Sequence, residues 1–293
     1  MRVTQGMLSN NMLSNLTNSY AKFNTYFDQL STGKKISLPS QDPVVAMKGI
    51  NYRAQVAEIG QFQRNISEVH NWMDNTDAAL DKATAAMQKL RELAIQASNG
   101  TNDDQALNSI KEEAEQLQEH LIDIANTNVN GKYIFNGTNT DTAPVTKNED
   151  GGILIEHNTS PVMIEVAHGT KLQVNVEGES IFSKDLFADI DKFIKALESG
   201  DQEEMDQSIS VLDENINRII DERADLGARM NRLELVENRL SEQEIIATKT
   251  MSDNEDIDFE EVITNLLTQE SLHRAALAAG SRIIQPSLID FLR

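Results

Sequence analysis

A sustained seven-residue repeat of apolar residues between residues 59 and 97 constrains this chain more than any other feature. Two sets of positions repeat, the second three residues after the first. The first set is Ile59, Ile66, Met73, Leu80, Met87 and Ala94, and the second is Phe62, Val69, Thr76, Ala83, Leu90 and Ala97. Such a repeat places both sets on one face of a helix and is typical of coiled coils. The sequence therefore predicts a long helix whose apolar seam is covered by other helices.

Two more segments carry matching helical patterns. The turn formers at residues 99–102, NGTN, predict the end of the first helix, and a second helix over residues 107–124 then runs antiparallel to it. A third seam extends over residues 209–247. Charged residues interrupt the other half of this seam at Arg223, Glu237 and Glu244. These segments predict an α-helical rod domain over residues 44–130 and 203–255.

Between the helical parts, the pattern changes to short runs typical of β-strands. Residues 132–135 precede an Asn136-Gly137 turn, and a strand over residues 153–155 follows. The clearest alternation is Val162, Ile164 and Val166, then Leu172, Val174 and Val176, joined across His168-Gly169-Thr170. We expect a β-rich outer domain over residues 131–202. The predicted fold is mainly α with a small β-rich insertion, and its N- and C-terminal parts form a long coiled-coil-like helical rod.

The two ends of the chain carry weaker helical patterns. Apolar residues between positions 13 and 30 step by three and four, but Asn, Ser and Thr fill the positions between them and compete with the helical backbone for hydrogen bonds. We expect residues 1–43 and 256–293 to be assembly segments that are disordered in the monomer. The simplest packing pairs the two ends with each other. The candidate interface residues are Leu13, Leu16, Tyr20, Phe23, Phe27, Leu30, Leu266, Leu272, Ala276 and Ile283.

A stretch that no helix can cross separates the first segment from the rod. In residues 30–43, LSTGKKISLPSQDP, two prolines lack a backbone donor and push the residues before them toward extended backbone, while a glycine frees the chain to turn. The residues that shape this joint are Gly33, Ile36, Leu38, Pro39, Asp42 and Pro43. On the other side of the rod, the acidic run at residues 253–261 indicates a hinge or a helix N-terminus.

Charge and composition exclude several classes of partner. The chain has 26 basic and 47 acidic residues and a net charge of −21, so we expect no binding to nucleic acid or to an anionic membrane. The first 55 residues are the exception, with six basic residues against two acidic ones. The chain has no cysteine, and no apolar run approaches 18 residues. We expect neither a cleaved signal peptide nor a transmembrane helix, so export would need another route.

No pattern in the sequence indicates catalysis or metal binding. Nucleotide-binding, hydrolase and metalloprotease motifs are absent from the sequence, and no carboxylate lies in an apolar context that would shift its pKa for acid–base chemistry. His120 lies near Glu119 and Asp123, but Leu117 occupies the position where a Glu-x-x-His pair needs its carboxylate. Trp72, beside Met73 on the heptad face, is expected in an interface or in the core and not in a ligand site. We expect no enzyme activity, no metal and no cofactor.

Four motifs resemble the bacterial flagellin family. Residues 30–36, LSTGKKI, with Asp42 are similar to that family's joint signature, and residues 90–96, LRELAIQ, to its first rod helix. Residues 226–233, LGARMNRL, and residues 281–284, SRII, resemble its downstream half. The rod signature residues carried over from these matches are Arg91, Glu92, Leu93, Leu226, Gly227, Asn231 and Arg232. The likeness covers roughly residues 1–137 and 205–293.

The resemblance implies a self-associating axial protomer that the flagellar type III apparatus exports to the extracellular flagellum. The chain differs from filament flagellins at Pro43, in its opening residues MRVTQ and in its short central insertion. These differences favour a family member at the junction between hook and filament. Its implied partners are copies of itself in a ring, another hook-associated junction protein, flagellin, the export machinery and an export chaperone.

Two other readings remain open at this point. A filament flagellin would share the same assembly mechanism but would polymerise without limit. A cytoplasmic coiled-coil adaptor or signalling rod would instead have both terminal helices already folded in the free protein.

Overall fold

The computed structural model describes residues 5–99, 103–147 and 152–284, and the side chains of residues 6–99, 103–147 and 152–281. Along these residues, three helices are followed by six strands and then by four helices. The helices are α1 (Gln5–Thr32), α2 (Pro43–Ser98), α3 (Asp104–Ala125), α4 (Gly178–Ile181), α5 (Lys184–Ser199), α6 (Gln202–Glu255) and α7 (Phe259–Ile284). The strands are β1 (Asn128–Val129), β2 (Lys132–Tyr133), β3 (Val145–Lys147), β4 (Ile153–Ile155), β5 (Met163–Ala167) and β6 (Thr170–Gln173).

The chain divides into two compact units. One consists of residues 1–58 and 243–293, which we call the terminal unit, and the other of residues 59–242, which we call the central unit. The first turns of α2 and the last turns of α6 thus belong with the terminal helices, whereas the sequence grouped them with the rod. The β-strands belong to the same compact unit as the helices of the predicted rod.

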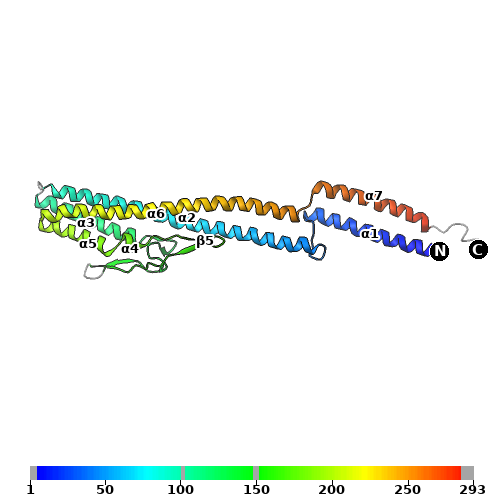
Figure 1. The fold of residues 1–293 in the computed structure, drawn as a ribbon, viewed down its shortest axis with the longest axis horizontal. Helices are drawn as coiled ribbons and strands as arrows, with labels where there is room; N and C mark the ends of the chain where they lie inside the picture. The colour runs from blue at the N-terminus through cyan, green and yellow to red at the C-terminus, as the bar shows by residue number, and fades with distance from the viewer. Residues whose placement is uncertain (1–4, 100–102, 148–151, 285–293) are drawn as a thin grey trace, which may run out of the picture. The chain divides into compact units, whose positions relative to one another are not determined.

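In the central unit, the predicted heptad seam of α2 is the core. Both repeating sets are buried, apart from the half-buried Phe62. Trp72 lies in this core, as predicted, with 8% of its surface exposed. The described part of α2 ends at Ser98, and residues 100–102 of the predicted turn lie outside the described residues. Figure 1 shows α3, α5 and α6 alongside α2, so helices cover the seam as the repeat predicted.

Ion pairs fix α2 and α6 as antiparallel neighbours. Arg91 Nε lies 2.5 Å from Asp213 Oδ1, and Arg223 Nε lies 2.7 Å from Asp77 Oδ1. Further along the pair, His70 Nε2 and Glu237 Oε2 are 3.0 Å apart. Residue numbers rise along α2 as they fall along α6. Arg223 and Glu237, which interrupt the apolar seam in sequence, therefore serve as cross-helix polar partners, Arg223 in an ion pair and Glu237 in a hydrogen bond.

The strands form three separate two-stranded antiparallel sheets, β1–β2, β3–β4 and β5–β6. The predicted hairpin is confirmed as β5–β6, with Gly169 at φ +71° in its two-residue turn. The strands are shorter than the predicted alternation, because Val162, Val174 and Val176 lie outside them, and the register shifts between Glu165 and Ala167. The strand predicted at residues 132–135 is shorter, and its partner β1 precedes it. Asn130 and Gly131 both have positive φ in the turn between β1 and β2, as a type I′ turn requires.

In the terminal unit, α1 and α7 pack side by side (Figure 1). They are antiparallel, because Gln269 Nε2 donates to the Ser19 carbonyl near mid-helix, while Gly280 lies against Met12 near the start of α1. The expected pairing of the chain's two ends is therefore confirmed. Residues 285–293, which include the predicted end of the last helix, lie outside the described residues, as does the side chain of Ile283.

Candidate assembly surface and joint

The seam between α1 and α7 uses only half of the interface residues predicted on α1. Leu16, Phe23 and Leu30 are half-buried, and they alternate with Met12, Ser19 and Tyr26, which are also half-buried. On α7, the covered positions are Val262, Leu266, Gln269, His273, Ala276 and Gly280. Both helices thus present residues at steps of three and four, the spacing of a coiled-coil seam.

The other predicted α1 residues are more than half exposed, although the Tyr20 ring still contacts the His273 ring of α7, with the ring centroids 6.0 Å apart. Leu13, Tyr20 and Phe27 are 54%, 56% and 56% exposed. Three of the six predicted α1 residues therefore lie in the seam with α7, and the other three lie outside it. The cause is an overlap of two heptad frames, which have Leu16, Phe23 and Leu30 in common. The sequence pattern selected the frame containing Leu13, and α7 occupies the frame containing Met12.

Two exposed α7 residues extend the outward α1 stripe. In an antiparallel pair, residues that directly follow the seam on each helix lie along the same flank. Ile263 and Leu277, which are 42% and 48% exposed, hold that position on α7, and Glu270 between them is paired with Arg274 of its own helix. We call Leu13, Tyr20, Phe27, Ile263 and Leu277 the apolar flank. The opposite flank of α1 is polar, with Asn15, Lys22 and Gln29, and faces the exposed Leu272 side of α7.

The joint residues are organised as turn and cap. Gly33 ends α1 at φ +69°, a conformation that favours glycine. Asp42 caps α2, since its Oδ1 accepts from the backbone N–H groups of Val44 at 2.9 Å and Val45 at 3.1 Å. Pro43 is the first residue of that helix, where its missing donor costs nothing. Of the other predicted joint residues, Ile36 is half-buried, whereas Leu38 and Pro39 are exposed.

A buried acid, which the sequence did not single out, meets the joint from the other end of the chain. Glu255, the last residue of α6, is 4% exposed. Its Oε1 lies 2.7 Å from Arg53 Nε, and its Oε2 lies 3.4 Å from Lys34 Nζ. These hydrogen bonds from Arg53 and Lys34 hold the pKa of Glu255 below its usual range. The next residue, Asp256, receives Lys34 Nζ at 2.6 Å, which lowers the pKa of Asp256 and raises that of Lys34.

The acidic run around Glu255 contains the helix start that the sequence predicted. Asp258 Oδ1 accepts from the backbone N–H groups of Glu260 at 3.0 Å and Glu261 at 3.2 Å, so it caps α7. The run therefore both closes α6 and opens α7. Within the run, Glu255 and Asp256 form ion pairs and Asp258 forms a cap.

The rod signature residues lie in the central unit. Four of the seven are either buried or paired with a charged side chain. Leu93 and Leu226 are buried at 2% and 0% exposure, and Arg91 pairs with Asp213. Glu92 contacts Lys89 of its own helix at 3.6 Å. Asn231 and Arg232 are exposed, and Gly227 has open space where a Cβ would lie.

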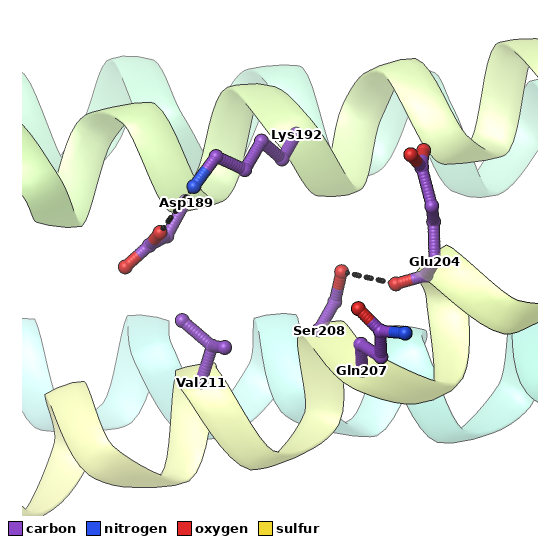
Figure 2. Close-up of a pocket in the computed structure, with 6 residues that line it drawn as sticks. All are labelled: Asp189, Lys192, Glu204, Gln207, Ser208 and Val211. Carbon is purple, nitrogen blue, oxygen red and sulfur yellow. Dashed lines mark hydrogen bonds and ion pairs between the residues drawn. The ribbon is translucent and has the colours of Figure 1, made fainter.

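A surface pocket between α5 and α6 is lined by Asp189, Lys192, Glu204, Gln207, Ser208 and Val211 (Figure 2). Lys192 Nζ contacts Asp189 Oδ1 at 3.3 Å, and Asn215 Nδ2 donates to Asp189 Oδ2 at 3.1 Å. The Ser208 hydroxyl donates to the Glu204 carbonyl at 2.8 Å. These polar groups tie α5 to α6 and stabilise each helix, so we interpret the pocket as a packing groove.

Within residues 5–99, 103–147 and 152–284, no three His, Asp or Glu side chains converge as a metal site would require. Across that same part of the chain, every helix is too short or too polar to cross a bilayer.

Comparison with known proteins gives two family matches. Residues 3–140 match the bacterial flagellin N-terminal helical region, and residues 209–292 match the bacterial flagellin C-terminal helical region. Together the two matches cover more than half of the chain. They lie on either side of the part that carries β3–β6, α4 and α5.

Individual relatives extend over nearly the whole chain. Flagellar hook-associated protein 3 of Escherichia coli is 28% identical, over 95% of this chain and 96% of the relative. Flagellin of Bacillus subtilis is 27% identical, over 95% and 94%. The fold is similar to the crystal structure of the flagellar junction protein FlgL from Legionella pneumophila, with a TM-score of 0.61, 17% identity, and coverage of 71% of this chain and 100% of that one.

Proposed function

Because the chain belongs to the bacterial flagellin family, we propose that it is a structural axial protomer of the flagellum at the junction between hook and filament. Two features support the junction over the filament. The near full-length likeness includes a hook-associated protein 3. Pro43 also departs from the pattern that the resemblance implies for filament flagellins, whereas the short insertion does not distinguish them, because flagellin of Bacillus subtilis aligns over 94% of its own length.

The observation that carries the assembly role is the exposed half of a heptad frame on α1. Leu13, Tyr20 and Phe27 complete a coiled-coil seam with Leu16, Phe23 and Leu30, yet α7 packs against the alternative frame. More than half of each of these three large side chains is left in water. A soluble chain gains no stability from keeping such a stripe exposed, whereas a protomer gains it when a second helix covers the stripe.

In this proposal, the apolar flank of one copy packs on the helices of the next copy. Repetition of the contact gives a ring. One face of the ring then meets the other hook-associated junction protein, and the opposite face meets flagellin. In the single chain α1 and α7 already form a helix pair, so assembly would cover the apolar flank of this pair and would not have to create the helices. Lys22 and the polar positions beside it leave the opposite flank of α1 free to face water.

The same proposal places the chain outside the cell. The flagellar type III apparatus would export it unfolded, without a cleaved signal peptide, and an export chaperone would cover the apolar ends before export. We propose no catalytic role and no cofactor.

Deletion of the gene in the chain's own bacterium tests the proposal. We expect cells that keep their hooks, lack filaments and release flagellin monomers into the medium, with full recovery when the gene is restored. Filaments that persist after deletion would exclude the junction role. A purified chain that grows into long filaments by itself would instead favour filament flagellin, the reading that the Bacillus subtilis relative supports.

A further inference from the structure

Glu255 connects three stretches of the terminal unit through one buried side chain. Its two carboxylate oxygens reach Arg53 of α2 and Lys34 of the joint, and its carbonyl oxygen accepts from the Lys35 N–H at 2.7 Å. A buried carboxylate is stable only when such partners are kept, because an unpaired one would be strongly destabilising. The position of Glu255 therefore fixes α2, the joint and the end of α6 together.

Gly49 of α2 provides the space that the carboxylate occupies. A Cβ at this position would lie 2.5 Å from Glu255 Oε1, which is closer than real Cβ contacts. Glycine inside a helix is destabilising relative to alanine. Gly49 is itself buried and has no turn to make, so the close approach of Glu255 accounts for a glycine there.

A short backbone bridge runs beside the carboxylate. Lys34 and Asp256 form an isolated antiparallel β-bridge, and the Ile257 N–H donates to the Gly33 carbonyl at 3.1 Å. This bridge joins the two chain segments that connect the α1–α7 pair to the ends of α2 and α6. It consists of only a few hydrogen bonds, so it depends on the side chains that hold it in place.

We propose that Glu255, seated over Gly49 and bound by Arg53 and Lys34, is a latch that fixes the α1–α7 pair against the ends of α2 and α6. When the latch is broken, the backbone bridge opens and the helix pair moves as a body. The helices themselves stay intact, because the seam between α1 and α7 contains none of the latch residues. The latch operates in the single chain and does not depend on the proposed assembly role.

Two variants break the latch by different physical routes. Glu255→Gln removes the charge and keeps the shape. Gly49→Ala leaves every charge in place but fills the space of the carboxylate, whose flexible end then moves out. Gly60→Ala is the matched control in the same helix, because its Cβ would meet nothing closer than Arg64 Nη1 at 3.8 Å.

Because the chain contains no cysteine, spin labels can be placed on Asn51→Cys of α2 and Ser271→Cys of α7, both exposed, and their separation measured by double electron–electron resonance. We expect one narrow distance distribution in the labelled parent and in Gly60→Ala, and a broad one in Glu255→Gln and Gly49→Ala. Hydrogen exchange at the Lys35 and Ile257 amides is expected to rise at least tenfold in the two latch variants, with α1 and α7 still protected.

Three outcomes would overturn the proposal. A broad distribution in the labelled parent would show that the latch does not fix the helix pair. Narrow distributions in both latch variants would show that other contacts do so. Loss of protection throughout α1 and α7 would make Glu255 a residue that the helices need for folding.

Discussion

Replacement of Phe27 by aspartate separates an assembly role of the apolar flank from a role in the fold. Phe27 is 56% exposed in the single chain, so a polar residue there costs the free protein little. Covering the exposed part of a Phe side chain stabilises a contact by about 1–1.5 kcal/mol. Burying a carboxylate at the same place adds a cost of about 2 kcal/mol or more. Together these effects weaken each contact between copies by more than about a hundredfold.

The measurement compares three variants of α1. Phe27→Asp is expected to keep the circular dichroism and thermal unfolding of the parent while its incorporation into flagella, and with it motility, is lost. Thr25→Asp, an exposed position on α1 away from the flank, is the matched control and should assemble. Phe23→Asp should disrupt the α1–α7 pair itself, because Phe23 lies in the seam. Normal assembly of Phe27→Asp, or loss of α1 protection in its free chain, would refute the reasoning.

Three further predictions concern other contacts. Gly280→Ala places a Cβ in the space of the Met12 side chain and should reduce protection of the α1–α7 pair in hydrogen exchange, with recovery in the double variant that also carries Met12→Ala; no recovery would contradict the packing. The lowered pKa of Glu255 means that its ion pairs stabilise the fold above the ordinary value of about 4.5 and are lost as pH falls below it. The distribution of distances between spin labels at positions 51 and 271 should therefore broaden in the parent as the pH falls below about 4.5. The distribution in Glu255→Gln, which is already broad, should not change with pH. Arg223→Met removes half-exposed ion pairs to α2, so the free energy of unfolding, measured by thermal unfolding, should fall by no more than about 1 kcal/mol. A larger fall would assign these pairs a greater role.

The helical core could be predicted because burial repeats with the period of the helix. Positions such as Met73 and Leu90 are fully buried, and each had been assigned by spacing alone. The β5–β6 hairpin was predictable for the same reason, with a period of two and a glycine at its turn. Gly33, Asp42 and Pro43 were identifiable because turns and helix caps use few residue types.

The latch could not be predicted because its parts give no periodic signal. Glu255 belongs to a run of acids, which usually indicates a solvated segment, and Arg53 and Lys34 are some two hundred residues away in sequence. Gly49 interrupts a helix without any local reason. Only the three-dimensional structure brings the glycine and the carboxylate to the same place.

The choice between two heptad frames on α1 was also undetermined by sequence. One frame uses Leu13, Tyr20 and Phe27, and the other uses Met12, Ser19 and Tyr26. Hydrophobicity favours the first frame, which is why the pattern selected it. The structure pairs α7 with the weaker frame. This arrangement is physically reasonable if the stronger frame is kept for a contact between copies, where the entropy cost of association also has to be offset.

The distribution of charge supports the terminal unit as the place where copies meet. The terminal unit holds ten basic and twelve acidic residues, whereas the central unit holds sixteen basic and thirty-five acidic ones. Two identical surfaces of high net charge repel each other at close range, and salt screens the repulsion only beyond about 8 Å. A unit of nearly balanced charge avoids this cost when copies pack closely. The apolar flank lies on that unit, so its exposed side chains and its low net charge favour the same contact.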